Sequence, residues 1–98
     1  MMEDNNMIKV NEYFEGNVKS LGNILNDQSF SVGIIEPGEY TFGTSAKEHM
    51  EVVFGEMEVT APKNLKKIYK KGEFFKVDAN SEFTVNIKEP VSYICLYN

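Results

Sequence analysis

The sequence contains no arginine, and histidine and cysteine occur once each, as His49 and Cys95. Without a guanidinium group the protein has no planar, bidentate clamp for a phosphate or a carboxylate. A single cysteine cannot form an internal disulfide, and residues 1–9 lack the basic and apolar segments of a secretory signal. Together these absences indicate the reducing environment of the cytoplasm.

Long apolar runs and an excess of positive charge are absent as well. No stretch approaches the roughly 18 to 20 apolar residues that a membrane-spanning helix needs. The net charge of −5 argues against a general nucleic-acid binder. Positive charge is nevertheless concentrated in the lysine-rich segment 63–76. That segment is interpreted either as an edge strand whose lysines prevent unwanted pairing or as a rim that attracts anions.

What the sequence does contain is a regular alternation of apolar residues, as at Phe83, Val85 and Ile87. Turn signals such as Pro37-Gly38 separate most of these segments by roughly eight to ten residues. The chain is long enough for one domain with one core. We therefore expect a mobile leader at residues 1–9 and a single all-β domain at 10–98. Its nine or ten short strands are expected at 10–15, 17–25, 28–35, 39–44, 49–54, 56–61, 65–69, 73–77, 82–88 and 91–97.

One spacing resembles the first motif of the cupin family. Members of that family are small RmlC-like barrels of the jelly-roll type. Gly38 precedes a strand, and Glu48 is followed after six residues by Gly55, as in that motif. The resemblance implies that the all-β domain is a small cupin-type barrel.

The metal ligands of that family are mostly missing. The two histidines of the first motif fall near Phe42 and Thr44, and the histidine of the second motif is replaced by Phe83. Glu48 alone, without an imidazole, is a poor ligand set for zinc, iron or manganese, so we expect no metal and no other cofactor. His49 follows Glu48 directly and should face the opposite side of the sheet, in a surface or cross-strand role.

Five short segments occur in order along the chain: Asn11-Glu12-Tyr13-Phe14, Val18-Lys19-Ser20, Gly38-Glu39-Tyr40-Thr41-Phe42, Ser81-Glu82-Phe83 and Ser92-Tyr93-Ile94-Cys95. Together they resemble the pyrimidine/purine nucleoside phosphorylase family of small bacterial cupins, over nearly the whole chain. The resemblance implies phosphate-dependent cleavage of nucleosides to a free base and ribose 1-phosphate, a glycosyl transfer of nucleotide salvage. It also implies a homodimer. Nucleosides and inorganic phosphate are then the expected ligands, with neither nucleic acid nor membrane as a partner.

Phosphorolysis must hold phosphate on one face of the ribose, grip the ribose hydroxyls, stack the base and stabilise developing charge. We predict that Glu48 is catalytic, either at a ribose hydroxyl or by countering positive charge. Lys19 with Ser20 is predicted to seat the phosphate, as a point charge and a hydroxyl donor. Strand alternation also directs several residues into the barrel. The remaining predicted substrate-binding residues are Tyr40, Phe42, Thr44, Glu82, Phe83 and Tyr93.

Each of these residues also has a structural interpretation. Glu48 can be a buried hydrogen-bond hub, Lys19 a solvent-facing strand lysine, and the aromatic residues plain core; Cys95 is interpreted as a small strand residue. Two other functions stay open at this point. A non-catalytic module would bind a nucleoside, a sugar or another small metabolite in a polar pocket, whereas a structural or regulatory dimer would have a barrel filled by Phe and Met.

Overall fold

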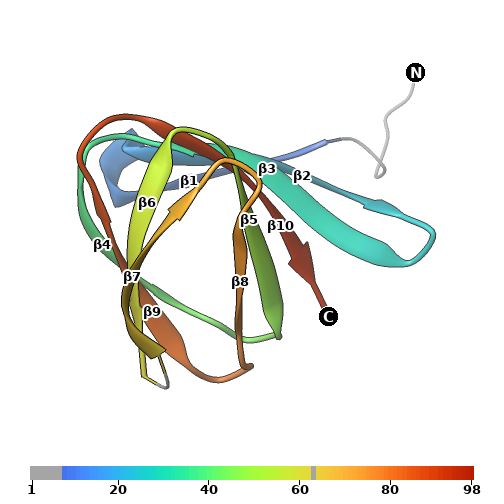
Figure 1. Ribbon diagram of the computed structural model, residues 1–98. Coiled ribbons are helices and arrows are strands. Elements are labelled where there is room, and N and C mark those ends of the chain that lie inside the picture. Colours follow the sequence, from blue (N-terminus) through green and yellow to red (C-terminus); the bar gives the residue numbers. More distant parts are fainter. Residues whose placement is uncertain (1–7, 63) are drawn as a thin grey trace.

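Ten strands form two antiparallel sheets in the computed structural model, which describes residues 8–62 and 64–98 (Figure 1). The six-stranded sheet has the order β1 (Lys9–Tyr13), β2 (Val18–Leu25), β3 (Gln28–Ile35), β10 (Val91–Tyr97), β5 (Glu48–Phe54) and β8 (Phe74–Val77). The four-stranded sheet has the order β4 (Gly38–Gly43), β9 (Glu82–Ile87), β6 (Glu56–Ala61) and β7 (Asn64–Lys70).

The predicted all-β architecture is confirmed, and each strand lies within one or two residues of its expected bounds. Residues 1–7 of the predicted leader lie outside the described residues, and β1 begins at Lys9. A single 3-10 turn, η1 (Phe14–Gly16), joins β1 to β2. Within the described chain, no helix has the length and apolar character needed to cross a membrane.

Aromatic side chains fill the space between the two sheets. Phe83 stacks on Phe42 with ring centroids 5.4 Å apart, and Phe75 meets Phe83 edge-on at 5.6 Å. Tyr69 continues the contact to Phe75 at 5.0 Å. Phe14, from η1, closes one end of this cluster by packing 5.4 Å from Phe42. Offset and edge-on contacts of this kind are favourable for aromatic pairs, so the barrel interior is a packed core.

The β2–β3 hairpin extends beyond this core (Figure 1). Its two turn residues, Asn26 and Asp27, have φ values of 51° and 65°, the conformation of a tight two-residue hairpin turn. The molecule is elongated as a result, with extents of 46 × 25 × 24 Å. The inner face of the six-stranded sheet therefore continues past the edge of the four-stranded sheet that covers it elsewhere.

The lysine-rich segment forms an exposed edge. Among the strands that the structure describes, β7 pairs only with β6, and its Lys66, Lys67 and Lys70 are exposed. Lys67 holds its ammonium group 5.0 Å from the centre of the Tyr69 ring, a cation–π contact. Lysines at an edge hinder pairing with another chain, in line with the first interpretation of this segment. Lys63, which belongs to the same segment, lies outside the described residues.

Candidate functional site

A groove of about 760 Å³ lies on the inner face of the six-stranded sheet, along the part of the β2–β3 hairpin that extends beyond the core. Polar and apolar side chains line it together. The lining residues come from β1, β2, β3 and β10: Lys9, Asn11, Tyr13, Gly22, Asn23, Ile24, Ser29, Phe30, Ser31 and Tyr97. A concave site of this size and mixed character suits a small polar ligand.

The register of the sheet brings these side chains together in three neighbouring rows. The first row is Lys9, Gly22, Ser31 and Cys95. The second is Asn11, Ser20, Gly33 and Tyr93. The third is Ile24, Ser29, Tyr97 and Glu48. Because alternate residues of a strand point to the same face, all three rows project inward.

Tyr97 is held firmly against the groove. Its hydroxyl forms a hydrogen bond of 2.8 Å with the hydroxyl of Ser31. The side-chain amide of Gln28 donates to the carbonyl oxygens of Ser29 and Tyr97, at 2.8 and 2.7 Å. Burial raises the pKa of the Tyr97 hydroxyl, which therefore remains a neutral donor and acceptor.

A second polar cluster lies one row deeper. The Asn11 amide donates to the Ser20 hydroxyl at 3.2 Å. Burial raises the pKa of Tyr93 to about 12, although a hydrogen bond with Ser20 partly opposes this shift. Asn11, Ser20 and Tyr93 thus connect β1, β2 and β10 through uncharged polar groups.

Glu48 lies at the far side of the third row, next to Cys95. The thiol donates to Oε1 of Glu48 at 3.5 Å. Burial raises the pKa of the Glu48 carboxyl, and the thiol hydrogen bond opposes that shift. Burial, followed by the charge of Glu48, raises the pKa of Cys95 to about 12, so the thiol is a donor and not a nucleophile. Glu48 does not itself line the groove, but it is the cross-strand neighbour of Tyr97, which does.

Three of the residues predicted from the sequence share this face: Ser20 and Tyr93 lie in one row, and Glu48 lies two rows away. Lys19 does not join them. It precedes Ser20 on β2, so its exposed side chain projects from the outer face while Ser20 projects inward and is buried. Lys19 and Ser20 nevertheless both line a hollow on the outer face of this sheet, together with Tyr93, so their predicted role in seating phosphate stays a prediction.

The other predicted residues lie in the core or at its rim. Phe42 and Phe83 stack on one another, and the Tyr40 hydroxyl donates to the carbonyl oxygens of Glu36 and Pro37. Their predicted inward direction is confirmed, but they pack against other core residues. Glu82 is exposed at the start of β9.

Thr44 has a structural role that is visible in its contacts. Its hydroxyl donates to the carbonyl oxygen of Asp78 at 2.7 Å and accepts from the backbone N–H of Ser81 at 2.9 Å. These bonds connect the loop after β4 to the turn before β9.

Sequence reasoning missed Lys9, Asn11, Ser31 and Tyr97. Strand alternation places Tyr97 on the same face as Tyr93 and Cys95, so the inward direction of its side chain could be predicted from the sequence. The missing information was the length of the β2–β3 hairpin relative to the opposite sheet, because that difference leaves the inner face open.

The residues present do not fit the metal site of cupins. Phe42, Thr44 and Phe83 stand in the ligand places, and the described residues contain no group of three or more His, Cys, Asp and Glu side chains that could hold an ion. His49 stacks on Phe74 of the neighbouring strand, with ring centroids 4.5 Å apart, as its predicted cross-strand role requires.

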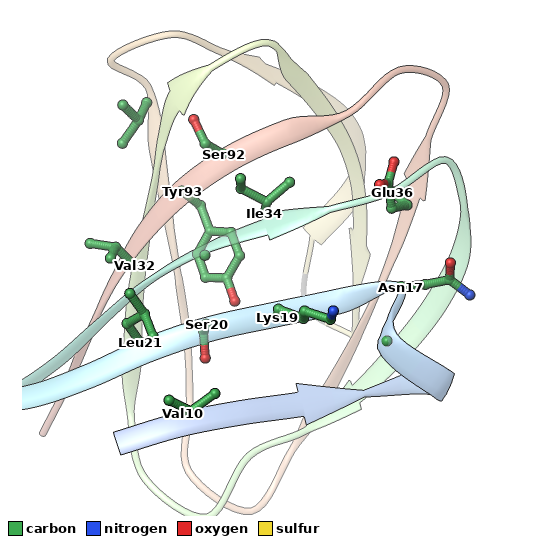
Figure 2. Close-up of a pocket in the computed structure, with 13 residues that line it drawn as sticks. Val10, Asn17, Lys19, Ser20, Leu21, Val32, Ile34, Glu36, Ser92 and Tyr93 are labelled. Atoms are coloured by element: carbon green, nitrogen blue, oxygen red, sulfur yellow. The ribbon is translucent and has the colours of Figure 1, made fainter. Parts of the chain in front are cut away.

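The outer face of the same sheet carries an apolar hollow of about 620 Å³ (Figure 2). Val10 and Ile34 line it and are 71% and 56% exposed. Lys19 and Glu36 lie toward one end of it, with Leu21 and Val32 toward the other (Figure 2). Exposed apolar residues gathered in one patch indicate a contact surface.

Comparison with known proteins agrees with this architecture. The model of the family described as pyrimidine/purine nucleoside phosphorylase matches residues 8–97. A protein of unknown function from Vibrio parahaemolyticus is 45% identical, with a TM-score of 0.89 over 94% of this chain and 99% of that one. An Acinetobacter protein of unknown function is 28% identical, with a TM-score of 0.86 over 98% of both chains. An RmlC-like cupin from Shewanella frigidimarina, 16% identical, shares the fold with a TM-score of 0.73 over 97% of this chain and 86% of that one.

Proposed function

We propose that this chain, which belongs to the pyrimidine/purine nucleoside phosphorylase family, cleaves purine and pyrimidine nucleosides with inorganic phosphate, without a metal or another cofactor. The observation that carries the proposal is the groove of about 760 Å³, whose hydroxyl, amide and tyrosine side chains suit a sugar that carries an aromatic base. The family match supports the reaction type. A cytoplasmic role in nucleotide salvage belongs to the same proposal.

The reaction requires one bond to form and one to break. An oxygen of hydrogen phosphate forms a bond to the anomeric carbon of the ribose, and the bond from that carbon to the base nitrogen breaks. The electron pair of the broken bond stays with the base, which takes up the proton released by hydrogen phosphate. Because the ribose acquires positive charge on the way, positioning and electrostatics can supply most of the catalysis.

The groove offers groups that suit the base and the ribose. Tyr13 and Tyr97 flank it and provide aromatic surfaces for the base. Asn11 and Ser29 present polar atoms that can hydrogen-bond the ribose hydroxyls.

Glu48 provides the negative charge in this proposal. Within the described part of the chain it is the one carboxylate on the inner face of the six-stranded sheet. Half-buried surroundings strengthen its effect on a developing cation, since the local dielectric is lower than that of water.

Turnover by the purified protein is the direct test. Uridine, adenosine and guanosine are incubated with and without phosphate, and chromatography detects free base and ribose 1-phosphate. We expect both products only when phosphate is present, with activity that persists in a chelator. Absence of phosphate-dependent base release from all three nucleosides would remove the proposal. Nucleoside binding without turnover, measured by calorimetry, would then favour the non-catalytic binding module.

The apolar hollow on the outer face supports the second part of the proposal, a symmetric homodimer. Val10, Leu21 and Ile34 are exposed there, with Lys19 and Glu36 at one end of the hollow. A two-fold axis through such a patch would place the same apolar surface of two copies together. A second copy of this chain is therefore the occupant that we propose. In that arrangement Lys19 belongs to the interface.

A further inference from the structure

We infer that the groove seats its phosphate at the Lys9 end, where Lys9, Asn11 and the bare backbone of Gly22 form the anion subsite. The inference rests on the proposed phosphorolysis and differs from the sequence-based expectation that Lys19 and Ser20 seat the phosphate. It assigns a ligand to a part of the groove that the five family-like segments only partly cover.

Charge is the first argument. Among the described residues that line the groove, Lys9 is the only cation. A chain without arginine must use lysine to hold a phosphate dianion through a charged side chain. The net charge of −5 makes a local cation more important, because the rest of the protein repels an anion. Lys19 cannot serve this groove, since it projects from the opposite face of β2.

Space is the second argument. Gly22 lies directly opposite Lys9, between it and Ser31. A Cβ added to Gly22 would stand 3.4 Å from the Phe30 carbonyl oxygen and 3.8 Å from Asn11 Nδ2, which are ordinary contacts. Neither packing nor backbone conformation therefore demands glycine at this position. Because Gly22 has no side chain, a hollow remains beside β1 at this position.

A second hydrogen-bond donor faces the same hollow. One N–H of the Asn11 side-chain amide donates to Ser20 Oγ at 3.2 Å. The amide carries a second N–H, and its nitrogen stands 3.8 Å from the position that a Cβ on Gly22 would take. A cation and an amide donor around an open floor match the charge and the acceptor oxygens of phosphate.

This placement also arranges the charges of the reaction. Lys9 lies on the edge strand β1 and Glu48 on β5, with β2, β3 and β10 between them. Four strand spacings of about 4.8 Å separate β1 from β5, about 19 Å, so Glu48 would act on a ribose near Lys9 through its electric field and not by contact.

The experiment compares Lys9→Met with Lys19→Met, which removes the same charge from the opposite face of the sheet. Initial rates give the apparent KM for phosphate at saturating nucleoside. We expect Lys9→Met to raise the KM for phosphate by about tenfold to a hundredfold, because one hydrogen bond to a charged group is lost. The KM for nucleoside should change little. Lys9→Arg should recover most of the affinity. Lys19→Met, once light scattering has shown that it assembles as the wild type does, should have the wild-type KM for phosphate. Gly22→Ala should also raise the KM for phosphate. The added methyl group would occupy the hollow, and it would do so without a steric clash that could unfold the protein.

Calorimetric titration of inorganic phosphate into each variant, without nucleoside, separates this inference from the proposed function. Turnover by the wild type with an unchanged phosphate KM in Lys9→Met, or a raised KM only in Lys19→Met, would overturn the subsite and leave the phosphorolysis standing. Lys9-dependent binding of phosphate by a protein that releases no base would uphold the subsite and overturn the phosphorolysis.

Discussion

The Tyr93 side chain lies directly against Gly33 on the neighbouring strand β3, so that a Cβ added to Gly33 would stand 2.6 Å from the Tyr93 hydroxyl oxygen. The same atom would also stand 2.7 Å from the backbone oxygen of Lys19. Both separations are shorter than real contacts, so the absence of a side chain at Gly33 is what allows Tyr93 to reach Ser20. The inner face of the sheet thus depends on two glycines with different tasks, Gly33 for packing and Gly22 for open space.

Gly33→Ala should therefore destabilise the fold by about 1 to 3 kcal/mol, the range for an overpacked core position. Urea denaturation of the two proteins measures the difference. Gly43→Ala is the matched control, because a Cβ there would meet nothing closer than the Ser81 carbonyl oxygen at 4.0 Å. Equal stability of Gly33→Ala and Gly43→Ala would mean that Tyr93 does not occupy the described position.

The Ser31–Tyr97 hydroxyl pair should behave as a coupled unit. Tyr97→Phe leaves the buried Ser31 hydroxyl without this partner, and an unpaired buried polar group costs about 1 to 3 kcal/mol of unfolding free energy. The double variant Ser31→Ala with Tyr97→Phe removes both hydroxyls and should lose less than the sum of the single changes. Denaturation curves of all four proteins give the coupling directly. Additive losses would show that the two hydroxyls do not interact in solution.

Glu48 should make stability depend on pH. Burial raises its pKa in the folded protein above the ordinary value of 4.5, so the protonated carboxyl is favoured by folding. Its stabilising contribution is full below pH 4.5 and is lost as the pH rises through the folded pKa. Glu48→Gln stays neutral, so its stability relative to the wild type should increase as the pH rises from about 4.5 to 7.

Urea denaturation across that range measures the effect, with Glu51→Gln as a control that removes a carboxylate from the outer face of the same strand. A constant difference between Glu48→Gln and the wild type would contradict the raised pKa.

Turnover should be more sensitive to Glu48 than nucleoside affinity is. Glu48→Gln keeps the shape of the side chain but removes its charge, so kcat should fall by about 10²-fold or more if the carboxylate stabilises the transition state. The variant must first be shown to fold, by circular dichroism and denaturation. Glu51→Gln should retain wild-type turnover. A loss of nucleoside affinity alone would assign Glu48 to ground-state binding of the ribose.

Assembly can be measured without any substrate. Light scattering should give twice the chain mass of 11.2 kDa at micromolar concentration. Ile34→Asp places a charge in the apolar hollow of the outer face and should yield monomers, because a buried unpaired charge opposes association. Leu65→Asp, at an exposed position on the other sheet, should leave the dimer intact. A monomeric wild type would exclude the homodimer, and a dimeric Ile34→Asp would exclude this face as its interface.

Much of the fold could be predicted because turns and alternation are local properties. Pro37-Gly38 and Gly55 mark changes of strand that any chain of this pattern must make, and Phe83 and Val85 face inward as expected. The site residues were harder to predict, because residues that are adjacent in a strand face opposite sides of the sheet. Lys19 and Ser20 share a family-like segment but face opposite sides of the sheet, whereas Lys9 and Ser31 meet only through the pairing of three strands.

The position of β1 at the edge of the sheet has a consequence for how the groove moves. β1 supplies Lys9, Asn11 and Tyr13 to the groove, yet among the described strands it pairs only with β2. An edge strand with a single partner can detach without unfolding the remaining core, and segments of this kind exchange their amide hydrogens at a lower free-energy cost than central strands. The wall that meets the ligand is thus one of the two edge strands of the sheet, which open more easily than its central strands. Occupancy of the groove and attachment of the first strand are therefore one coupled equilibrium, in which each stabilises the other.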